Sequence, residues 1–442
     1  MQRENGRTAL VEDPGRLRLL AQRIADGALS PVDLVQRYLD RIACVEPQIS
    51  CWRVVDAAGA LAAAHARHDE ARAGRLRGAL HGVPVAIKDI IDVEGIPTRA
   101  NCRARDEVAP AAGDAEIVRA MRAQGAIVLG KVHTTEYAFF DPSPARNPHN
   151  PGHTPGGSSS GSAAAVAAGM APLAIGTQTV ASVNRPAAYC GVAAFKPSTG
   201  SLSAFGITPL GPSYDTPGFY GWSVNDAAFG YEAVAPGFAG SPARKSTRVL
   251  SIVIPDDAHI ADAVPDVKRS IAGAARRLTK AGHQVSKVKS PIDFARLFRI
   301  QRTTMLYEAG RALKFLFDHP KGLVGEKLTA AMRDGLAIDQ SRYLAERGEI
   351  DGMRRAFFSA FAKADVFMWP ATPGPAPEGL AWTGDPKYIA PWTALGGPIV
   401  TIPIGKAANG LPLGCIISSR PGSDRAMCQW ARRVADIIER HS

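Results

Sequence analysis

Apolar positions recur at helical spacing through much of the first 72 residues. In the stretch 29–42, LSPVDLVQRYLDRI, they fall three or four residues apart, which is the period of one helix face. Ser30 can cap this helix, and Pro31 suits its first turn because the N–H that proline lacks would have no partner there. The pattern therefore predicts that residues 15–72 are helical.

Beyond residue 80, short apolar runs bounded by Gly and Pro predict strands. The predicted strands lie within residues 82–91, 126–131, 171–176, 191–198, 248–255, 283–289, 366–373 and 398–405. Helices are predicted at 115–124, 265–282 and 300–363, the last interrupted near 318–322. This alternation is typical of an α/β fold whose sheet is covered by helices on both faces.

No linker or internal repeat divides the sequence, so we expect one large compact domain, 1–442, with a mixed, mostly central β-sheet. Within it we expect an N-terminal helical part (1–75) and a core (76–235). A variable part of helices and strands (236–360) would follow, and then a C-terminal return to the sheet (361–442).

The formal net charge is +11, but the Lys and Arg residues are scattered. No basic run alternates with aromatic residues, as a nucleic-acid groove would require. The six cysteines lack the C-x-x-C spacing of a zinc or redox site, so we expect no metal and no cofactor. The sequence has no apolar run of signal-peptide or membrane-spanning length. We therefore expect a cytoplasmic protein without nucleic-acid or membrane partners.

The block 154–169, TPGGSSSGSAAAVAAG, has the composition of a flexible spacer. It also contains a G-x-S-x-G match that would make Ser159 a hydrolase nucleophile, but a proline and glycine loop precedes it where that turn needs a buried strand. Residues 147–184 contain no Lys, Arg, Asp or Glu. A spacer has no reason to avoid charge, so this stretch is predicted to be buried with its polar groups hydrogen-bonded.

The stretch 156–198, GGSSSGSAAAVAAGMAPLAIGTQTVASVNRPAAYCGVAAFKPS, resembles the amidase signature family of serine hydrolases. The resemblance extends to GVPVAIKDIIDVEGIPT (82–98) and AIVLGKVHTTEYAF (126–139), and to PWTALGGPIVTIPIG near the C-terminus. It implies the amidase signature fold and hydrolysis of an amide bond. Residues 236–360 contribute least to it.

The resemblance implies a Ser-Ser-Lys triad, in which Lys88 matches the lysine, Ser158 the bridging serine and Ser182 the nucleophile. A serine hydroxyl needs an adjacent base, and a lysine can act as one only when it is neutral. Burial away from charge favours the neutral form, and the uncharged stretch 147–184 supplies no acidic partner. A bridging hydroxyl can then pass protons between Ser182 and Lys88.

Other site residues also follow from the resemblance. The backbone N–H groups of Thr179, Val180, Ala181 and Ser182 would form an oxyanion hole. Gly156 and Gly157 would let the backbone adopt unusual conformations beside Ser158, including the cis peptide that the family places there. Substrate contacts are expected from Tyr137 and from further aromatic residues, for which core packing is the alternative: Phe139, Tyr307, Trp382, Tyr388 and Trp392.

The sequence departs from the family pattern at Val180-Ala181, where the family has Gly-Gly or Ala-Gly, and Ala181 could crowd a substrate. Gln178 replaces the commoner Asp, and family members with Gln often carry arginine directly before the proline, as Arg185-Pro186 do here. The prediction is a metal-independent amidase that acts on a small-molecule amide, with esters and carbamates as further substrates, and a homodimer is left open. Two alternatives remain: a glutaminase-type subunit of an amidotransferase, or a catalytically impaired binding protein.

Overall fold

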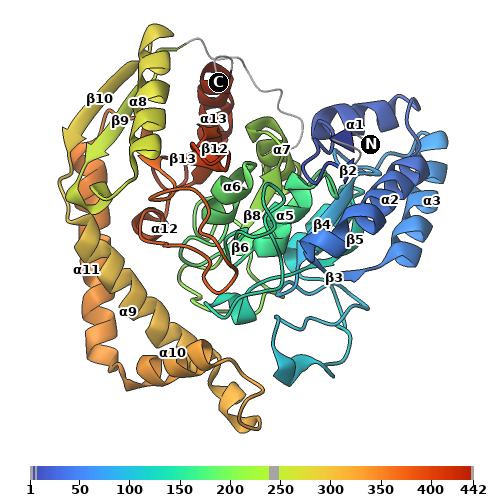
Figure 1. The fold of residues 1–442 in the computed structure, drawn as a ribbon, viewed down its shortest axis with the longest axis horizontal. Helices are drawn as coiled ribbons and strands as arrows, with labels where there is room; N and C mark the ends of the chain where they lie inside the picture. Colours follow the sequence, from blue (N-terminus) through green and yellow to red (C-terminus); the bar gives the residue numbers. More distant parts are fainter. Residues whose placement is uncertain (1–2, 5–6, 238–247, 440–442) are drawn as a thin grey trace.

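The main β-sheet runs across the whole molecule, and its eleven strands lie in the order β10-β9-β11-β13-β12-β7-β8-β6-β4-β5-β3 (Figure 1). The computed structural model describes residues 3–4, 7–237 and 248–439. Both parallel and antiparallel pairs occur in the sheet, which confirms the mixed α/β fold. The strands are β3 (Trp52–Val55), β4 (Pro84–Lys88), β5 (Ile127–Val132), β6 (Ala174–Gln178), β7 (Ala193–Lys196), β8 (Thr216–Gly221), β9 (Ser251–Asp256), β10 (Gln284–Lys289), β11 (Val366–Pro370), β12 (Ile399–Lys406) and β13 (Pro412–Ser418).

Helices cover both faces of the sheet. The described residues form α1 (Leu17–Ala25), α2 (Pro31–Ile49), α3 (Ala57–Arg72), α4 (Glu116–Ala123), α5 (Ser160–Ala167), α6 (Asn184–Cys190), α7 (Val224–Val234), α8 (Pro265–Lys280), α9 (Phe294–Ala312), α10 (Glu326–Ala337), α11 (Gln340–Ala360), α12 (Ala390–Leu395) and α13 (Asp424–Glu439). Helices α5 and α6 pack together against the middle strands, and α13 packs with α7 and α8 as a second group. Helices α9, α10 and α11 extend beyond the sheet on the side of β9 and β10 (Figure 1).

Strand β4 lies between β5 and β6 and runs parallel to both, so the C-terminal ends of these three strands meet at one edge of the sheet. Strand β8 runs antiparallel to β6, with Gln178 opposite Thr216. The start of β8 therefore lies beside the end of β6. This edge collects the loops that carry the predicted site residues.

The prediction of one helical segment over residues 15–72 was wrong in its middle. Ser30 does cap α2, where its Oγ accepts from the N–H of Val32. The helix ends because Ser50 takes up the left-handed conformation, with φ 51°. Residues Trp52–Val55 then form β3, which pairs with β5 and places a short strand between two helices.

Other boundaries also differ from the prediction. The segment 300–363 starts earlier, at Phe294, and its predicted interruption near 318–322 is confirmed by the gap between α9 and α10. A second break, near residue 338, was not predicted and divides the segment into three helices. Strands β8 and β13 were missed; Gly and Pro inside both weaken the strand pattern. The predicted strands nearest the site, β4, β5 and β6, are confirmed.

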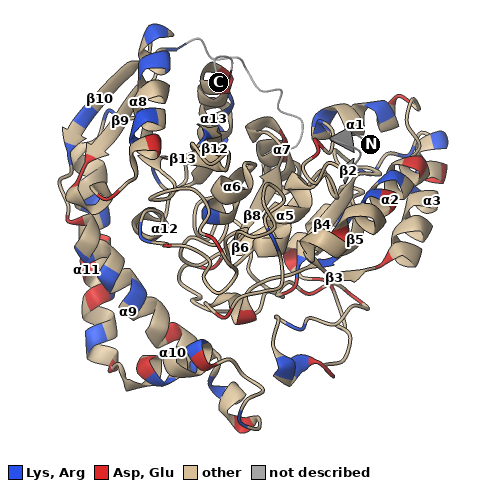
Figure 2. Ribbon diagram, in the orientation of Figure 1, with Lys and Arg blue, Asp and Glu red and all other residues tan. Residues whose placement is uncertain are grey.

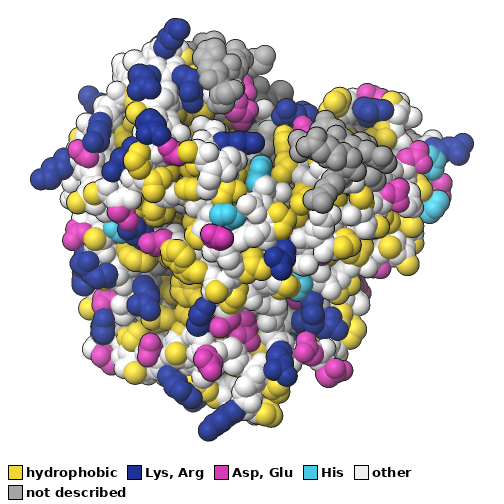
Figure 3. Space-filling model, viewed as in Figure 1, with side chains coloured by type: hydrophobic (Ala, Val, Ile, Leu, Met, Phe, Trp, Pro, Cys, Tyr) yellow, Lys and Arg dark blue, Asp and Glu magenta, His cyan; other side chains and the backbone are white. Residues whose placement is uncertain are grey.

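Charged residues lie mainly on the peripheral helices, whereas α5 and β6 carry none (Figure 2). Acidic and basic side chains are interspersed over the face shown in Figure 3. Across residues 3–4, 7–237 and 248–439, no helix is long and apolar enough to cross a membrane.

The buried carboxylate of Asp226 joins two helices. It accepts from the N–H of Leu17 at the start of α1 at 2.8 Å, and from the N–H and Oγ of Ser223 at the start of α7. We expect Asp226→Ala to lower the free energy of unfolding by about 2 kcal/mol, because it leaves buried donors without an acceptor. Chemical denaturation measures this change. Asp33→Ala, in the first turn of α2, should cost much less, and equal costs would contradict the prediction.

Candidate active site

Lys88 ends β4 and is completely buried. All five residues of this strand are buried. Its Nζ donates to Ser158 Oγ at 2.7 Å and to Thr177 Oγ1 at 2.8 Å. Two of the predicted site residues, Lys88 and Ser158, are therefore in direct contact although they lie 70 positions apart in the chain.

Burial lowers the pKa of Lys88 well below the usual range of a lysine, because the ammonium form loses its hydration. The carboxylate of Asp215 acts in the opposite direction and raises the pKa of Lys88. The uncharged stretch 147–184 indeed brings no acid to the lysine, but Asp215 approaches from the start of β8. The sequence analysis did not identify this carboxylate.

Ser158 follows a cis peptide bond, Gly157-Ser158. The carbonyl oxygen of Gly157 accepts from Arg185, whose Nη2 lies 2.7 Å away and whose Nε lies 3.2 Å away. A Cβ on Gly157 would lie 2.8 Å from Thr383 Cγ2, so only glycine fits this approach. Gly156 has φ +84° and takes the chain into the turn. These contacts fix the backbone on which the Ser158 hydroxyl is carried.

Ser182 lies at the N-terminal side of α6 and is 6% exposed. Its carbonyl oxygen accepts from the N–H of Ser159 at 3.2 Å and from Tyr220 Oη at 3.2 Å. Since Ser159 follows Ser158 directly, this bond brings the backbone of Ser182 beside the bridging serine. The Ser182 hydroxyl forms no hydrogen bond within the described part of the chain, so it is available to a substrate or to Ser158.

The loop from Thr179 to Ser182 has every carbonyl oxygen engaged. Gln301 donates to the Thr179 carbonyl, Thr393 to that of Val180, the N–H of Arg185 to that of Ala181, and Ser159 to that of Ser182. Among residues 7–237 and 248–439, none of the four N–H groups of this loop finds an acceptor. Four unpaired donors on one rigid loop suit an oxyanion. The side chains of Val180 and Ala181 are apolar and contain no acceptor that could bind these N–H groups.

Gln178 explains how the departure from the family's Asp is accommodated. Its Oε1 accepts from the N–H groups of Val183 and Asn184 at 2.8 and 3.0 Å, and so satisfies the donors at the start of α6. Its Nε2 donates to Thr393 Oγ1 at 2.9 Å, and Thr393 in turn donates to the Val180 carbonyl. One amide therefore binds the two N–H groups that follow the loop and, through Thr393, the Val180 carbonyl within it.

Ser159 has a structural role, in agreement with the rejection of the G-x-S-x-G match. Its Oγ donates to the Thr177 carbonyl at 3.1 Å and accepts from the Thr177 N–H at 3.2 Å. It is fully buried, and a Cβ on Gly176 would lie 2.6 Å from its Oγ. Both of its polar functions are used to join α5 to β6.

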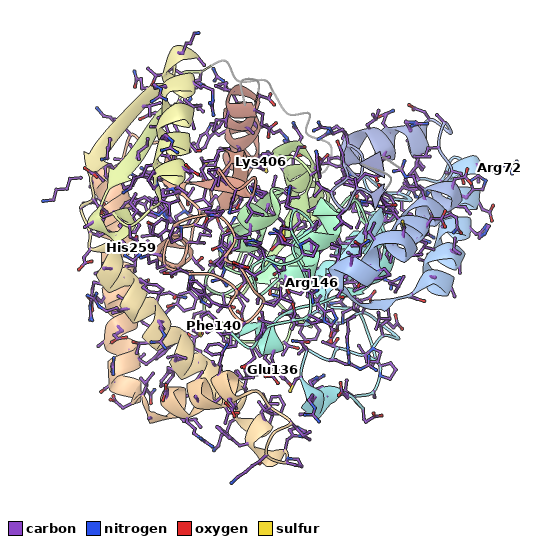
Figure 4. The ribbon with its side chains drawn as sticks, in the orientation of Figure 1. Arg72, Glu136, Phe140, Arg146, His259 and Lys406 are labelled. Atoms are coloured by element: carbon purple, nitrogen blue, oxygen red, sulfur yellow. The ribbon has the colours of Figure 1, made fainter. Side chains whose placement is uncertain are left out.

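Tyr137 belongs to a loop that contacts the site through Thr135, whose N–H donates to the Ser158 carbonyl at 3.1 Å. Tyr137 is buried with φ 46°, and burial raises its pKa to about 12. Glu136 accepts from the N–H of Gly325 just before α10. Glu136 and Phe140, labelled in Figure 4, lie between the central part of the molecule and α10. The loop thus bridges the site and the helices beyond the sheet.

The other aromatic candidates divide between core and surface. Trp392 is buried against Phe294 and Trp369, with ring centroids 5.6 Å apart in each case, so it packs in the core. Tyr388 is buried and donates to Asp262, and Tyr307 stacks on Tyr343 at 4.1 Å. Trp382 is 53% exposed, and Phe139 packs against Phe140.

Sequence reasoning missed several residues that surround the site: Thr177, Arg185 as the partner of Gly157, Asp215, Gln301 and Thr393. Only Arg185 carried a signal, since it was noted as the counterpart of Gln178. The others lie outside the resembling block or are common residues within it.

The Amidase family model matches residues 33–428. The chain is 30% identical to an amidase of Pseudomonas putida, over 95% of this chain and 97% of that protein. It is also 32% identical to a glutamyl-tRNA(Gln) amidotransferase subunit of Salinispora arenicola (strain CNS-205), over 95% of this chain and 96% of that protein.

Among solved structures, the native peptide amidase from Stenotrophomonas maltophilia is 29% identical and superposes with a TM-score of 0.82. The match covers 96% of this chain and 96% of that one. The fold and nearly the whole length are therefore shared, and the chain belongs to the amidase family of enzymes, which hydrolyse C–N bonds.

Proposed function

We propose that the protein hydrolyses a small carboxamide through a seryl acyl-enzyme, with Ser182 as nucleophile, Ser158 as proton relay and Lys88 as base. The observation that carries the proposal is the 2.7 Å hydrogen bond from Lys88 to Ser158 in a fully buried setting. A lysine in this setting is neutral more readily than in water, and a neutral amine can accept a proton.

In the acylation step, Ser182 Oγ attacks the amide carbon and forms a C–O bond. Its proton passes to Ser158 Oγ while the Ser158 proton passes to Lys88 Nζ, which becomes an ammonium. The negative oxygen of the tetrahedral intermediate accepts hydrogen bonds from the free N–H groups of the loop 179–182. The C–N bond then breaks, and the leaving nitrogen takes a proton from Ser158, which Lys88 replaces.

Water hydrolyses the acyl-enzyme by the same route. A water molecule attacks the acyl carbon, its proton travels through Ser158 to Lys88, and the C–O bond to Ser182 breaks. Ser182 recovers its proton from the relay. The products are a carboxylic acid and an amine or ammonia, and esters or carbamates can enter the same acyl-enzyme.

The likeness to the amidotransferase protein of Salinispora arenicola supports a second candidate, a glutaminase-type subunit. The two candidates differ in what the purified chain does alone. A panel of anilides, primary amides, esters, carbamates and glutamine distinguishes them: an autonomous amidase turns over at least one of the non-glutamine substrates. Activity on glutamine only, and only after partner chains are added, would favour the second candidate.

We expect a fluorophosphonate probe to form an adduct on Ser182, because phosphonylation needs only an activated serine and no knowledge of the substrate. Mass spectrometry of the digested protein identifies the labelled residue. Ser158→Ala and Lys88→Met should slow labelling at least about a hundredfold, since each removes a step of the proton path.

A matched control is Lys196→Met, because Lys196 is also a completely buried lysine, at the end of β7, whose pKa burial lowers to about 7. It should be labelled within about threefold of the wild-type rate. An adduct at another serine, or equal losses from Lys88→Met and Lys196→Met, would count against the triad.

The labelling rate should rise with pH as Lys88 loses its proton. Because burial lowers the pKa of Lys88, the midpoint of this rise should lie well below the value of about 10.4 for a lysine in water. Below the midpoint the ammonium form cannot accept the proton of the relay, so the rate falls. Stopped-flow labelling across neutral and alkaline pH measures the curve, and a midpoint near that of free lysine would contradict the assignment.

A further inference from the structure

Asp215 lies where the antiparallel pairing of β6 and β8 brings it beside the loop from Thr179 to Ser182, which we call the oxyanion loop. Gln178 is opposite Thr216, so the residue that follows β6, Thr179, faces Asp215. Thr179 Oγ1 donates to the Asp215 carboxylate. The other carboxylate oxygen accepts from the N–H groups of Leu210 and Gly211 at 2.9 and 3.1 Å. Three donors therefore fix Asp215, and one of them, Thr179, is the first residue of the loop whose N–H groups are free.

Lys88 is anchored to the same short segment. Its Nζ donates to Thr177 Oγ1, two residues before the threonine that donates to Asp215. A Cβ on Gly211 would lie 2.8 Å from Thr179 Cγ2, so the turn of Asp215 packs directly on the loop. The lysine and the carboxylate are thus bonded to two threonines, Thr177 and Thr179, that lie two residues apart at the end of β6.

One face of α9 holds both loops in place. Gln301 donates to the Thr179 carbonyl, Thr304 Oγ1 bonds to Tyr214 Oη at 2.5 Å, and Glu308 accepts from the N–H of Ser213 at 2.9 Å. These three residues follow helical spacing and are buried. Asp215 therefore belongs to a turn whose position the rest of the protein determines.

The charges near the pair are few. Burial raises the pKa of Asp215 above the usual carboxyl range, while the hydrogen bonds from Thr179, Leu210 and Gly211 lower it. The carboxylate of Glu308 on α9 also raises the pKa of Asp215, and its two oxygens accept from the N–H of Ser213 and from Tyr343 Oη. Asp89, the residue after Lys88, forms a buried ion pair with Lys131, whose Nζ lies 2.9 Å from Asp89 Oδ1.

We propose, on the basis of the proposed function, that Asp215 is a positioning residue for the reaction: its carboxylate holds Thr179 at the start of the oxyanion loop and stabilises the ammonium form of Lys88. When the relay delivers a proton to Lys88, a positive charge appears in a fully buried site. A fixed negative charge nearby favours that charge, because Coulomb interactions are strong where the dielectric constant is low. Asp215 itself exchanges no proton.

The test measures fluorophosphonate labelling against pH for Asp215→Asn and Asp215→Ser. Removing the negative charge destabilises the ammonium, so the midpoint of the labelling curve should move down by about 1 pH unit. The plateau rate should fall at least about tenfold, since the relay then produces an unstabilised charge. Asp215→Glu keeps the charge and should keep the wild-type midpoint, even if it reacts more slowly.

The matched control is Asp424→Asn. Asp424 is also buried, accepts from the N–H of Ser198 at 2.7 Å and raises the pKa of the buried Lys196. It should leave the midpoint of the labelling curve unchanged. Circular dichroism and melting temperature identify folded variants. If Asp215→Asn misfolds, Asp215→Ser still offers a hydroxyl oxygen as an acceptor for the backbone donors of the turn.

An unchanged midpoint in a folded neutral variant overturns the proposal, even if labelling slows, because a purely structural role changes the rate without shifting the titration. A downward shift in Asp424→Asn as large as that in Asp215→Asn overturns it too. Failure of the wild-type protein to form an adduct at Ser182 contradicts the proposed function instead.

Discussion

A lysine side chain removed entirely from water is the feature around which this site is arranged. Lys88 retains two hydrogen bonds, to Ser158 and Thr177, in exchange for the hydration it loses. Burial of a lone ammonium is costly, so the neutral amine is favoured. Each hydroxyl that the amine contacts must then be held in place, and this requirement extends to Arg185, which fixes the carbonyl before Ser158. Residues 147–184 contain no Lys, Arg, Asp or Glu, so this stretch places no charged side chain of these types against the buried amine.

The loop from Thr179 to Ser182, the proposed oxyanion loop, shows how a backbone can be rigid and still leave its donors free. Each carbonyl oxygen from Thr179 to Ser182 accepts a hydrogen bond, and these bonds come from α9, α12, α6 and the start of α5. Four separate elements therefore determine the direction of the N–H groups. A loop held in this way needs little reorganisation when charge develops in the reaction. Helix α9 contacts this loop through Gln301 and, through Thr304 and Glu308 on the same buried face, also holds the neighbouring turn at Ser213 and Tyr214.

The sequence was informative where chemistry and local pattern coincide. The capped helix at Ser30 and strands β4, β5 and β6 could be predicted, and Lys88 and Ser158 prove to be in contact. Strand β3 was missed because one left-handed residue, Ser50, ends a helix whose apolar pattern gives no warning. Asp215 was missed because its place depends on strand pairing, and Gln301 because residues 236–360 resemble the family least. Neither pairing nor helix docking can be seen in one sequence.

The turn that precedes β8 has a consequence for how the chain can change length. Asp215 accepts from the N–H groups of Leu210 and Gly211 in its own turn, so one added or deleted residue between them would disturb the hydrogen bonds that fix its carboxylate. The carboxylate would then lose its fixed position beside Thr179, while the pairing of β8 with β6 could stay unchanged. Loops usually tolerate insertions, but this turn is bounded by a strand on one side and by α9 on the other. Its length is therefore a determinant of the site, in addition to the identity of any single side chain.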